Sequence, residues 1–241
     1  QSHVRIRREG GKVTLVEQIE PSGSVRSTEK IAHLAGGGWE KPITNSRGVL
    51  VETVRMTKEG METHVNRSGS PFIQGCGRFA WKFDDKGNPI ERTCQDANGH
   101  TIIDAKGCQI LRLAYDERRL LVTVSCHAYD GRPLKNSDAV HLTRDTHDER
   151  GNITESAFFD DKGQGTPSFE GCLRVRAGYD AAGNKTTLTC IGPTGLPAPI
   201  RGSQMASVKY TYDDRGCQTK TEHFDVDGNT VAQFGIVATE T

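Results

Sequence analysis

The stretch YDDRGCQTKTEHFDVDGNT, residues 212–230, contains two Asp-rich turns that each end in glycine. Gly216 and Gly228 close these turns twelve residues apart, and a run of mixed polar and apolar residues lies between them. Asp at the start of a turn accepts backbone hydrogen bonds from two residues on, and Gly takes a positive φ without steric cost. Alternating acidic side chains are also typical of a calcium loop. The rest of the chain decides between a hairpin and a metal site.

The same turn recurs along the chain at a nearly constant period. The residues that close it are 32, 32, 32 and 33 positions apart: Gly87, Arg119, Gly151, Gly183 and Gly216. A second glycine follows each after twelve residues: Gly99, Gly131, Gly163, Gly195 and Gly228. A third often follows eight residues later, as at Gly107 and Gly171. Such a period is the signature of a repeat architecture, so it is interpreted before any local motif.

Upstream of residue 75 the pattern continues less regularly. Gly11 and Gly23 are twelve residues apart, as are Gly48 and Gly60, which brings the number of units to seven. An insertion at about residues 24–47 interrupts the first unit and contains AGGGWEKP. We therefore divide the chain into irregular N-terminal repeats (1–74) and regular 32-residue repeats (75–241), within one continuous repeat domain.

Each unit is predicted to form strand, turn, strand, turn, strand. The segments between turns are short and alternate in polarity, as in NITESAFF (152–159), which is typical of antiparallel hairpins. One hairpin buries too little surface to be stable alone, so neighbouring units must pair or stack. The prediction is an all-β repeat array of antiparallel hairpins that forms a spiral ribbon or solenoid-like structure. A seven-bladed β-propeller is the alternative, although its blades usually need about 40 to 45 residues.

Three turn sequences carry a resemblance to a known family: FDDKGN (83–88), HDERGN (147–152) and YDAAGN (179–184). They resemble the YD-type repeats of bacterial RHS proteins and related repeats of bacterial surface proteins. The likeness is good over residues 75–241 and weak over 1–74. It implies β-strand ribbons that spiral into shells, tubes or extended surface structures. The unit is longer than the usual YD repeat and no protease or toxin signature follows, so the resemblance concerns the fold first.

The seven cysteines follow the repeat. Three pairs share a separation of 18 residues: Cys76 and Cys94, Cys108 and Cys126, Cys172 and Cys190. In the unit between, Val140 and Phe158 occupy both cysteine positions, so the two members are absent together. Because the two cysteines of a unit are either both present or both absent, we predict disulfides rather than buried free thiols. The predicted bridges are Cys76–Cys94, Cys108–Cys126 and Cys172–Cys190, each between the first and second strands of one hairpin.

Cys217 remains as a free thiol, which either bridges to another subunit or is buried. Disulfides predict an oxidising location, so the chain is expected to be secreted, periplasmic or at the cell surface. The chain begins at Gln1 rather than Met, which fits a processed chain or an excised fragment.

Composition and motifs argue against most kinds of active site. The formal net charge is zero, so no overall attraction to nucleic acid or an anionic membrane is expected. No apolar run approaches the roughly 18 to 20 residues of a membrane span. The sequence lacks CxxC, HExxH, GxSxG and GxxxxGK motifs, and most turns lack the alternate carboxylates of a calcium loop. We therefore predict no catalytic, cofactor-binding or metal-binding residues and no cofactor.

Three functions are compatible with this sequence. The first is a non-catalytic extracytoplasmic repeat protein for surface structure, assembly or protein binding, with FGIVATET (234–241) as an open strand for filament formation. The second is an adhesin or carbohydrate-binding module that uses Trp39 in the insertion as a stacking platform, whereas Trp81 is expected to pack in the core. The third is a glycan-active enzyme, which would need two converging carboxylates.

Overall fold

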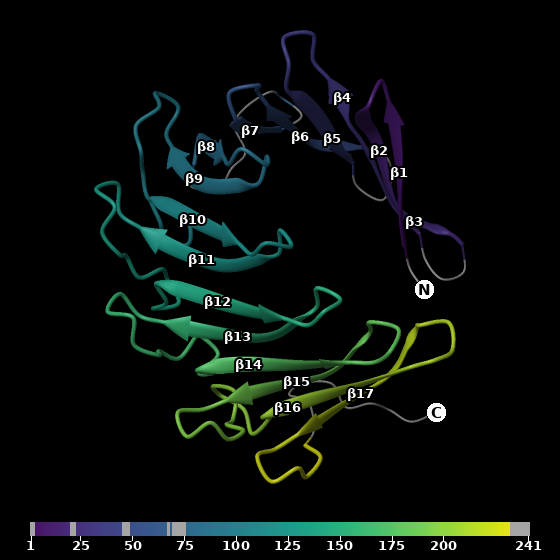
Figure 1. Cartoon of the computed structure of the whole chain (residues 1–241), viewed down its shortest axis with the longest axis vertical. Coiled ribbons are helices and arrows are strands. Elements are labelled where there is room, and N and C mark those ends of the chain that lie inside the picture. Colours follow the sequence, from purple (N-terminus) through teal and green to yellow (C-terminus); the bar gives the residue numbers. More distant parts are fainter. Residues whose placement is uncertain (1–2, 20–22, 45–48, 67, 69–75, 232–241) are drawn as a thin grey trace. The chain divides into compact units, whose positions relative to one another are not determined.

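The computed structural model describes residues 3–19, 23–44, 49–66, 68 and 76–231. These residues form strands, turns and irregular segments, with no helix among them. The chain divides into two compact units, residues 1–114 with 124–137 and residues 115–123 with 138–241. Figure 1 colours the strands in chain order.

The first unit contains the irregular repeats and the first regular ones. Its strands are β1 (His3–Glu9), β2 (Lys12–Ile19), β3 (Val25–Lys30), β4 (Ala32–His33), β5 (Trp39–Thr44), β6 (Leu50–Met56), β7 (Met61–Asn66), β8 (Arg78–Phe83) and β9 (Pro89–Gln95). The hairpin β10 (Ile110–Tyr115) and β11 (Leu121–His127) is divided between the two units. The strands of the second unit are β12 (Leu142–His147), β13 (Ile153–Phe159), β14 (Arg174–Tyr179), β15 (Lys185–Ile191), β16 (Ser207–Tyr212) and β17 (Gln218–Phe224).

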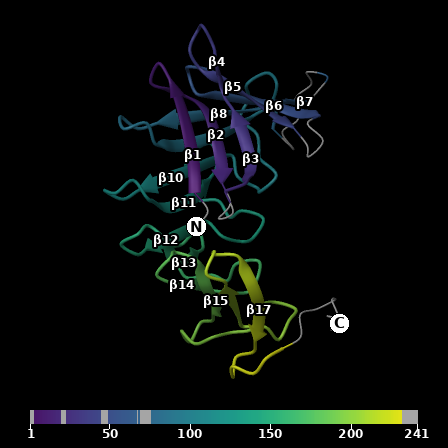
Figure 2. The ribbon, with the colours of Figure 1, turned by 90° about the vertical axis from the view of Figure 1, so that its right-hand side faces the viewer.

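The strands pair in chain order. β1, β2 and β3 form a three-stranded antiparallel sheet, seen face-on in Figure 2. β4 to β17 form a 14-stranded antiparallel sheet that does not close into a barrel. This confirms an all-β array of antiparallel hairpins. The propeller alternative is wrong, because consecutive hairpins hydrogen-bond edge to edge instead of forming separate four-stranded blades.

The described part of the insertion, residues 24–44, contains three strands. It contributes β3 to the small sheet, and β4 and β5 to the large one. The division into residues 1–74 and 75–241 stays a prediction.

The first turn of each unit follows from its sequence. In FDDKGN, Gly87 N–H donates to the Asp84 carbonyl at 3.1 Å, and Asp84 N–H donates to the Asn88 carbonyl at 2.9 Å. Gly87 takes a φ of 81°, and the strand register shifts between Lys82 and Phe83. A tight turn followed by a left-handed residue is the usual three-residue hairpin with a G1 bulge.

The turn register holds even where glycine is missing. Arg119 occupies the closing position of the first turn with a φ of 68°, and Ala139 takes a φ of 63° at the third turn. The repeat period predicted Arg119 as a turn-closing residue, whereas Ala139 was not among the predicted turn residues. A non-glycine residue in this region is strained, so the surrounding ladder imposes the conformation on both.

The predicted third strand of each unit is wrong. After the second turn the chain makes a single bridge to the preceding strand, at Gln95–Thr101, His127–Pro133, Phe159–Gly165, Ile191–Pro197 and Phe224–Thr230. Only eight residues separate the second and third turn glycines, for example Gly99 and Gly107, so no room is left for a ladder. Pro133 and Pro197 also lack the N–H that a ladder needs.

The longer unit carries its extra residue in the third turn. Here Ile200 N–H donates to the Met205 carbonyl at 2.7 Å, whereas Ser168 N–H donates to the Cys172 carbonyl in the preceding unit. The loop therefore spans six residues instead of five, and the hairpins keep their length. This accounts for the single spacing of 33.

Side chains tie neighbouring hairpins of the second unit together. The Tyr179 hydroxyl donates to the Ile153 carbonyl at 2.8 Å, and the Tyr212 hydroxyl donates to the Lys185 carbonyl at 2.7 Å. These bonds explain the tyrosines that precede Asp180 and Asp213. His147 stands in the same register and has no hydroxyl to make this bond.

Candidate functional site

The carboxylate of Asp225 makes its hydrogen bonds within the hairpin turn. Its Oδ1 accepts from the backbone N–H groups of Asp227 and Asn229 at 3.0 and 2.8 Å, and its Oδ2 accepts from Asn229 Nδ2 at 3.2 Å. The bonds from Asn229, its backbone N–H first, lower the pKa of the Asp225 carboxyl. The carboxylate therefore holds its own turn. Among the described residues, no group of three or more His, Cys, Asp or Glu side chains is placed to hold a metal ion.

The three disulfides predicted from the spacing are present. The Cα atoms lie 5.6 Å apart in Cys76–Cys94, 5.3 Å in Cys108–Cys126 and 5.2 Å in Cys172–Cys190. In each pair the first cysteine lies two residues before the first strand of its hairpin, not within that strand as expected. The bridge therefore joins the entry loop of a unit to the second strand of the same unit.

The cysteines also form the centre of the core. All six bridged cysteines are buried, at 4% exposed or less. Val140, which stands in a cysteine position of the unit without a bridge, is buried to the same degree. In the three bridged hairpins, buried side chains therefore gather where the entry loop meets the second strand.

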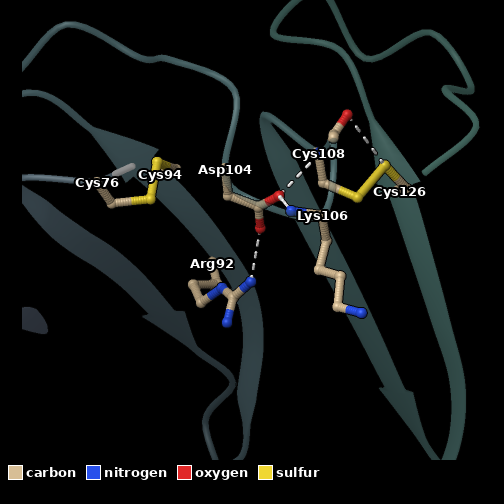
Figure 3. A network of polar contacts seen from close by, with 8 residues as sticks. Cys76, Arg92, Cys94, Asp104, Lys106, Cys108 and Cys126 are labelled. Carbon is tan, nitrogen blue, oxygen red and sulfur yellow. Dashed lines mark hydrogen bonds and ion pairs between the residues drawn. A yellow bond between two sulfur atoms is a disulfide. The ribbon is translucent and has the colours of Figure 1, made fainter. Parts of the chain in front are cut away.

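A polar network lies between two of these bridges in the first unit (Figure 3). Asp104 Oδ1 accepts from the N–H groups of Lys106 and Cys108, both at 2.9 Å. Asp104 Oδ2 accepts from Arg92 Nη2 at 2.9 Å, and the Arg92 guanidinium lies 4.4 Å from the centre of the Phe79 ring. This network fixes the loop that carries Cys108 to β9 of the preceding hairpin.

Cys217 is a free cysteine and is exposed. It stands at the end of the turn that Asp213 begins, and its N–H donates to Asp213 Oδ1 at 2.8 Å. The alternative of a buried thiol is therefore wrong. A bridge to another subunit stays a prediction.

The two tryptophans differ in their surroundings. Trp39 begins β5, is half-buried, and pairs with His33 of β4 and Met56 of β6. Trp81 is also half-buried, and its Nε1 donates to Glu62 Oε2 at 3.2 Å. Trp81 is thus anchored on the sheet, while a ligand at Trp39 stays a prediction.

A cluster that the sequence did not reveal lies on β6 and β7. His64 Nδ1 contacts Glu52 Oε1, and His64 Nε2 lies 2.9 Å from Glu62 Oε1. Glu62 and His64 share a strand face because they are two residues apart, and this spacing could have indicated that they are neighbours. Glu52 joins them only through the register of β6 and β7, which pairs Val54 with His64. The contacts on both ring nitrogens make this a structural clamp across the hairpin.

A groove of about 600 Å³ crosses one face of the second unit. It extends over four strands, β12 to β15, which lie side by side in Figure 1. Its residues are Thr143, Asp145, Gly151, Ile153, Ser156, Phe158, Val175, Ala177, Tyr179, Lys185 and Leu188. The lining combines aliphatic and aromatic side chains with a few polar groups, which is the composition of a binding site. None of these residues was a candidate from the sequence.

No helix long and apolar enough to cross a membrane occurs in the described part of the chain. No protein-family model and no curated protein matches the sequence. Among solved structures, the chain is similar to crystal structures of TcdB2-TccC3, one of them without its hypervariable C-terminal region. The identity is 12% in both cases, with TM-scores of 0.41 and 0.40, over 95% of this chain and 13% of the other. The chain thus spans about an eighth of the length of those proteins.

Proposed function

We propose that this chain is a non-catalytic, extracytoplasmic β-repeat protein that acts in surface structure, assembly or protein binding. The observation that carries the proposal is the set of three disulfides, each closing 18 residues at the same place in its hairpin unit. Structural disulfides persist in oxidising compartments, which favours a secreted, periplasmic or cell-surface protein. An array of paired hairpins also presents long faces and edges, which repeat proteins use to bind partners.

Many of the described carboxylates serve the turns. Eight carboxyl groups among the described residues have a lowered pKa: Glu91, Asp96, Asp116, Asp130, Asp148, Asp180, Glu222 and Asp225. Most of the lowered carboxylates belong to turns, where they accept backbone hydrogen bonds, so they serve the fold.

Two alternative functions depend on particular parts of the chain. Carbohydrate binding depends on Trp39, whose ring is half-buried. If Trp39 stacks on a sugar, Trp39→Ala should reduce retention of the protein on immobilised glycans. Filament formation depends on FGIVATET (234–241), which lies outside the described residues.

Peptide mapping without reduction, on protein alkylated during purification, tests the proposal. We expect three peptide pairs joined by the bridges and alkylation of Cys217 alone. Native mass spectrometry of the same sample reports assembly, and Cys217→Ser separates a disulfide-linked oligomer from a non-covalent one. Seven alkylated thiols in a folded sample would overturn the extracytoplasmic location.

A further inference from the structure

The groove over β12–β15 contains a polar pair where the repeat otherwise places apolar residues. The position six residues before the turn-closing residue is Trp81, Leu113, Asp145, Ala177 or Tyr210 in successive units. Asp145 is the one charged residue of this series and is paired with Ser156 across the hairpin. The next hairpin carries Ala177 and Leu188 at the equivalent pair. The polar pair is therefore not required by the repeat.

The Asp145 carboxylate is half-buried and only partly satisfied. Its Oδ1 accepts from the Ser156 hydroxyl at 2.6 Å, and within the described residues no further contact to this carboxylate is found. The strand register places Ser156 beside Val175, so the carboxylate lies at the border of an apolar surface. A partly desolvated carboxylate with a free oxygen favours a cationic hydrogen-bond donor.

The opposite side of the groove carries the opposite charge. Lys185 lines the groove from β15, is exposed, and takes part in no ion pair in the described part of the chain. β12 and β15 are separated by three strand spacings, about 14 Å. The register places Asp145 level with Val175 of β14, whereas Lys185 is level with Tyr179, four residues further along that strand. The two charged residues are therefore about 19 Å apart along a diagonal of the sheet, a distance that an extended peptide covers with about six residues. Between the two charges lie Val175, Ala177 and Leu188.

We propose that this groove binds an extended peptide segment that crosses the strands. A basic side chain of the segment pairs with Asp145, its apolar residues cover Val175, Ala177 and Leu188, and an acidic side chain pairs with Lys185. The proposal rests on the proposed binding role and names the class of partner. Charge complementarity at the two sides of an apolar floor fixes the orientation of the peptide.

The test is an NMR titration of the oxidised protein, labelled on Val and Leu methyl groups. The probe is the acetylated and amidated peptide Lys-Val-Ala-Val-Ala-Glu, and the control peptide is Gln-Val-Ala-Val-Ala-Gln. We expect saturable shifts at Val175 and Leu188, and a Kd at least tenfold lower for the charged peptide. Equal affinity for both peptides, or shifts away from the groove, would overturn the proposal.

Two variants separate recognition from folding. Asp145→Ala with Ser156→Leu installs the pair that the next hairpin carries as Ala177 and Leu188. We expect this variant to fold with unchanged or higher stability and to lose at least tenfold in affinity for the charged peptide. Asp161→Asn, an exposed carboxylate change outside the groove, should leave binding unchanged. Unaltered affinity of the double variant would refute the role of Asp145.

The disulfide map of the same sample distinguishes failure of the groove proposal from failure of the proposed function. Intact bridges without peptide binding would remove the groove proposal and leave the proposed scaffold function in place. Free thiols in a folded, peptide-binding protein would remove the proposed location and leave the groove proposal in place.

Discussion

Removal of one disulfide tests whether the bridges stabilise individual hairpins. The change is Cys172→Ala with Cys190→Ala, which opens a loop with a sequence separation of 18 residues. Loop-closure entropy for a loop of this size amounts to about 3 kcal/mol. The two side chains are 0% and 3% exposed, and each lost sulfur, taken as methylene-sized, adds about 0.8 kcal/mol. We therefore expect a loss of about 4 to 5 kcal/mol.

The loss should be local to the hairpin, because repeat arrays are stabilised mainly by nearest-neighbour contacts. The assay is native-state hydrogen exchange of the amides in β14 and β15, where about 4 kcal/mol corresponds to roughly a thousandfold loss of protection. The matched control is Cys76→Ala with Cys94→Ala, which has the same separation of 18 residues and should deprotect β8 and β9 instead. Reduction of the wild-type protein provides a second reading without mutation.

A loss below about 1 kcal/mol would refute the entropic argument. Loss of amide protection spread evenly over all hairpins would refute the expectation that the bridge stabilises only its own hairpin.

The remaining predictions concern the turns and the ties between hairpins. Arg119→Gly removes a left-handed φ of 68° from a residue with a Cβ, so the urea midpoint should rise by the equivalent of about 1 kcal/mol, and an unchanged midpoint would contradict the strain. Tyr179→Phe removes the 2.8 Å hydrogen bond to the Ile153 carbonyl and should lower the free energy of unfolding by about 1 kcal/mol in the same assay. An unchanged free energy of unfolding would contradict this contribution. The pKa of Asp180 is lowered from its ordinary 3.8, chiefly by the Asn184 side chain, so the turn should be stabilised above pH 3.8 and lose that stabilisation as the pH falls through the lower folded pKa. An NMR titration of the Asp180 carboxyl that gives an ordinary or raised pKa would contradict this.

Much of the fold was predictable because the turns are determined locally. Asp at the start and Gly at the close of a turn act through bonds within five residues, so the sequence period located both members of each hairpin. Arg119 was recognised as a turn residue by its register alone, and the structure confirms it with a positive φ. The cysteine pairs were predictable for a related reason, since identical separations imply identical geometry in every unit.

The errors and omissions depend on interactions across strands. The segment after the second turn was expected to be a strand, but its length leaves a single bridge such as Phe159–Gly165. The Asp145–Ser156 pair became visible only when the bulge between Thr146 and His147 defined which side chains share a face. Glu52 and His64 meet through a register that the irregular spacing of the first units concealed. Local sequence therefore predicts the turns, whereas the side chains that share a sheet face can be identified only from the pairing register of the strands.

The extra residue of the third turn between Ile200 and Met205 has a consequence for how such arrays change in length. The hairpins on either side of it keep the same pairing register despite the longer loop, since Thr187–Lys209 and Glu155–Arg176 pair at matching positions. A loop that accommodates an additional residue without changing the strand pairing on either side is a suitable place to insert foreign sequence. Epitopes or short binding loops grafted between Arg201 and Gln204 should be displayed at the margin of an undisturbed sheet.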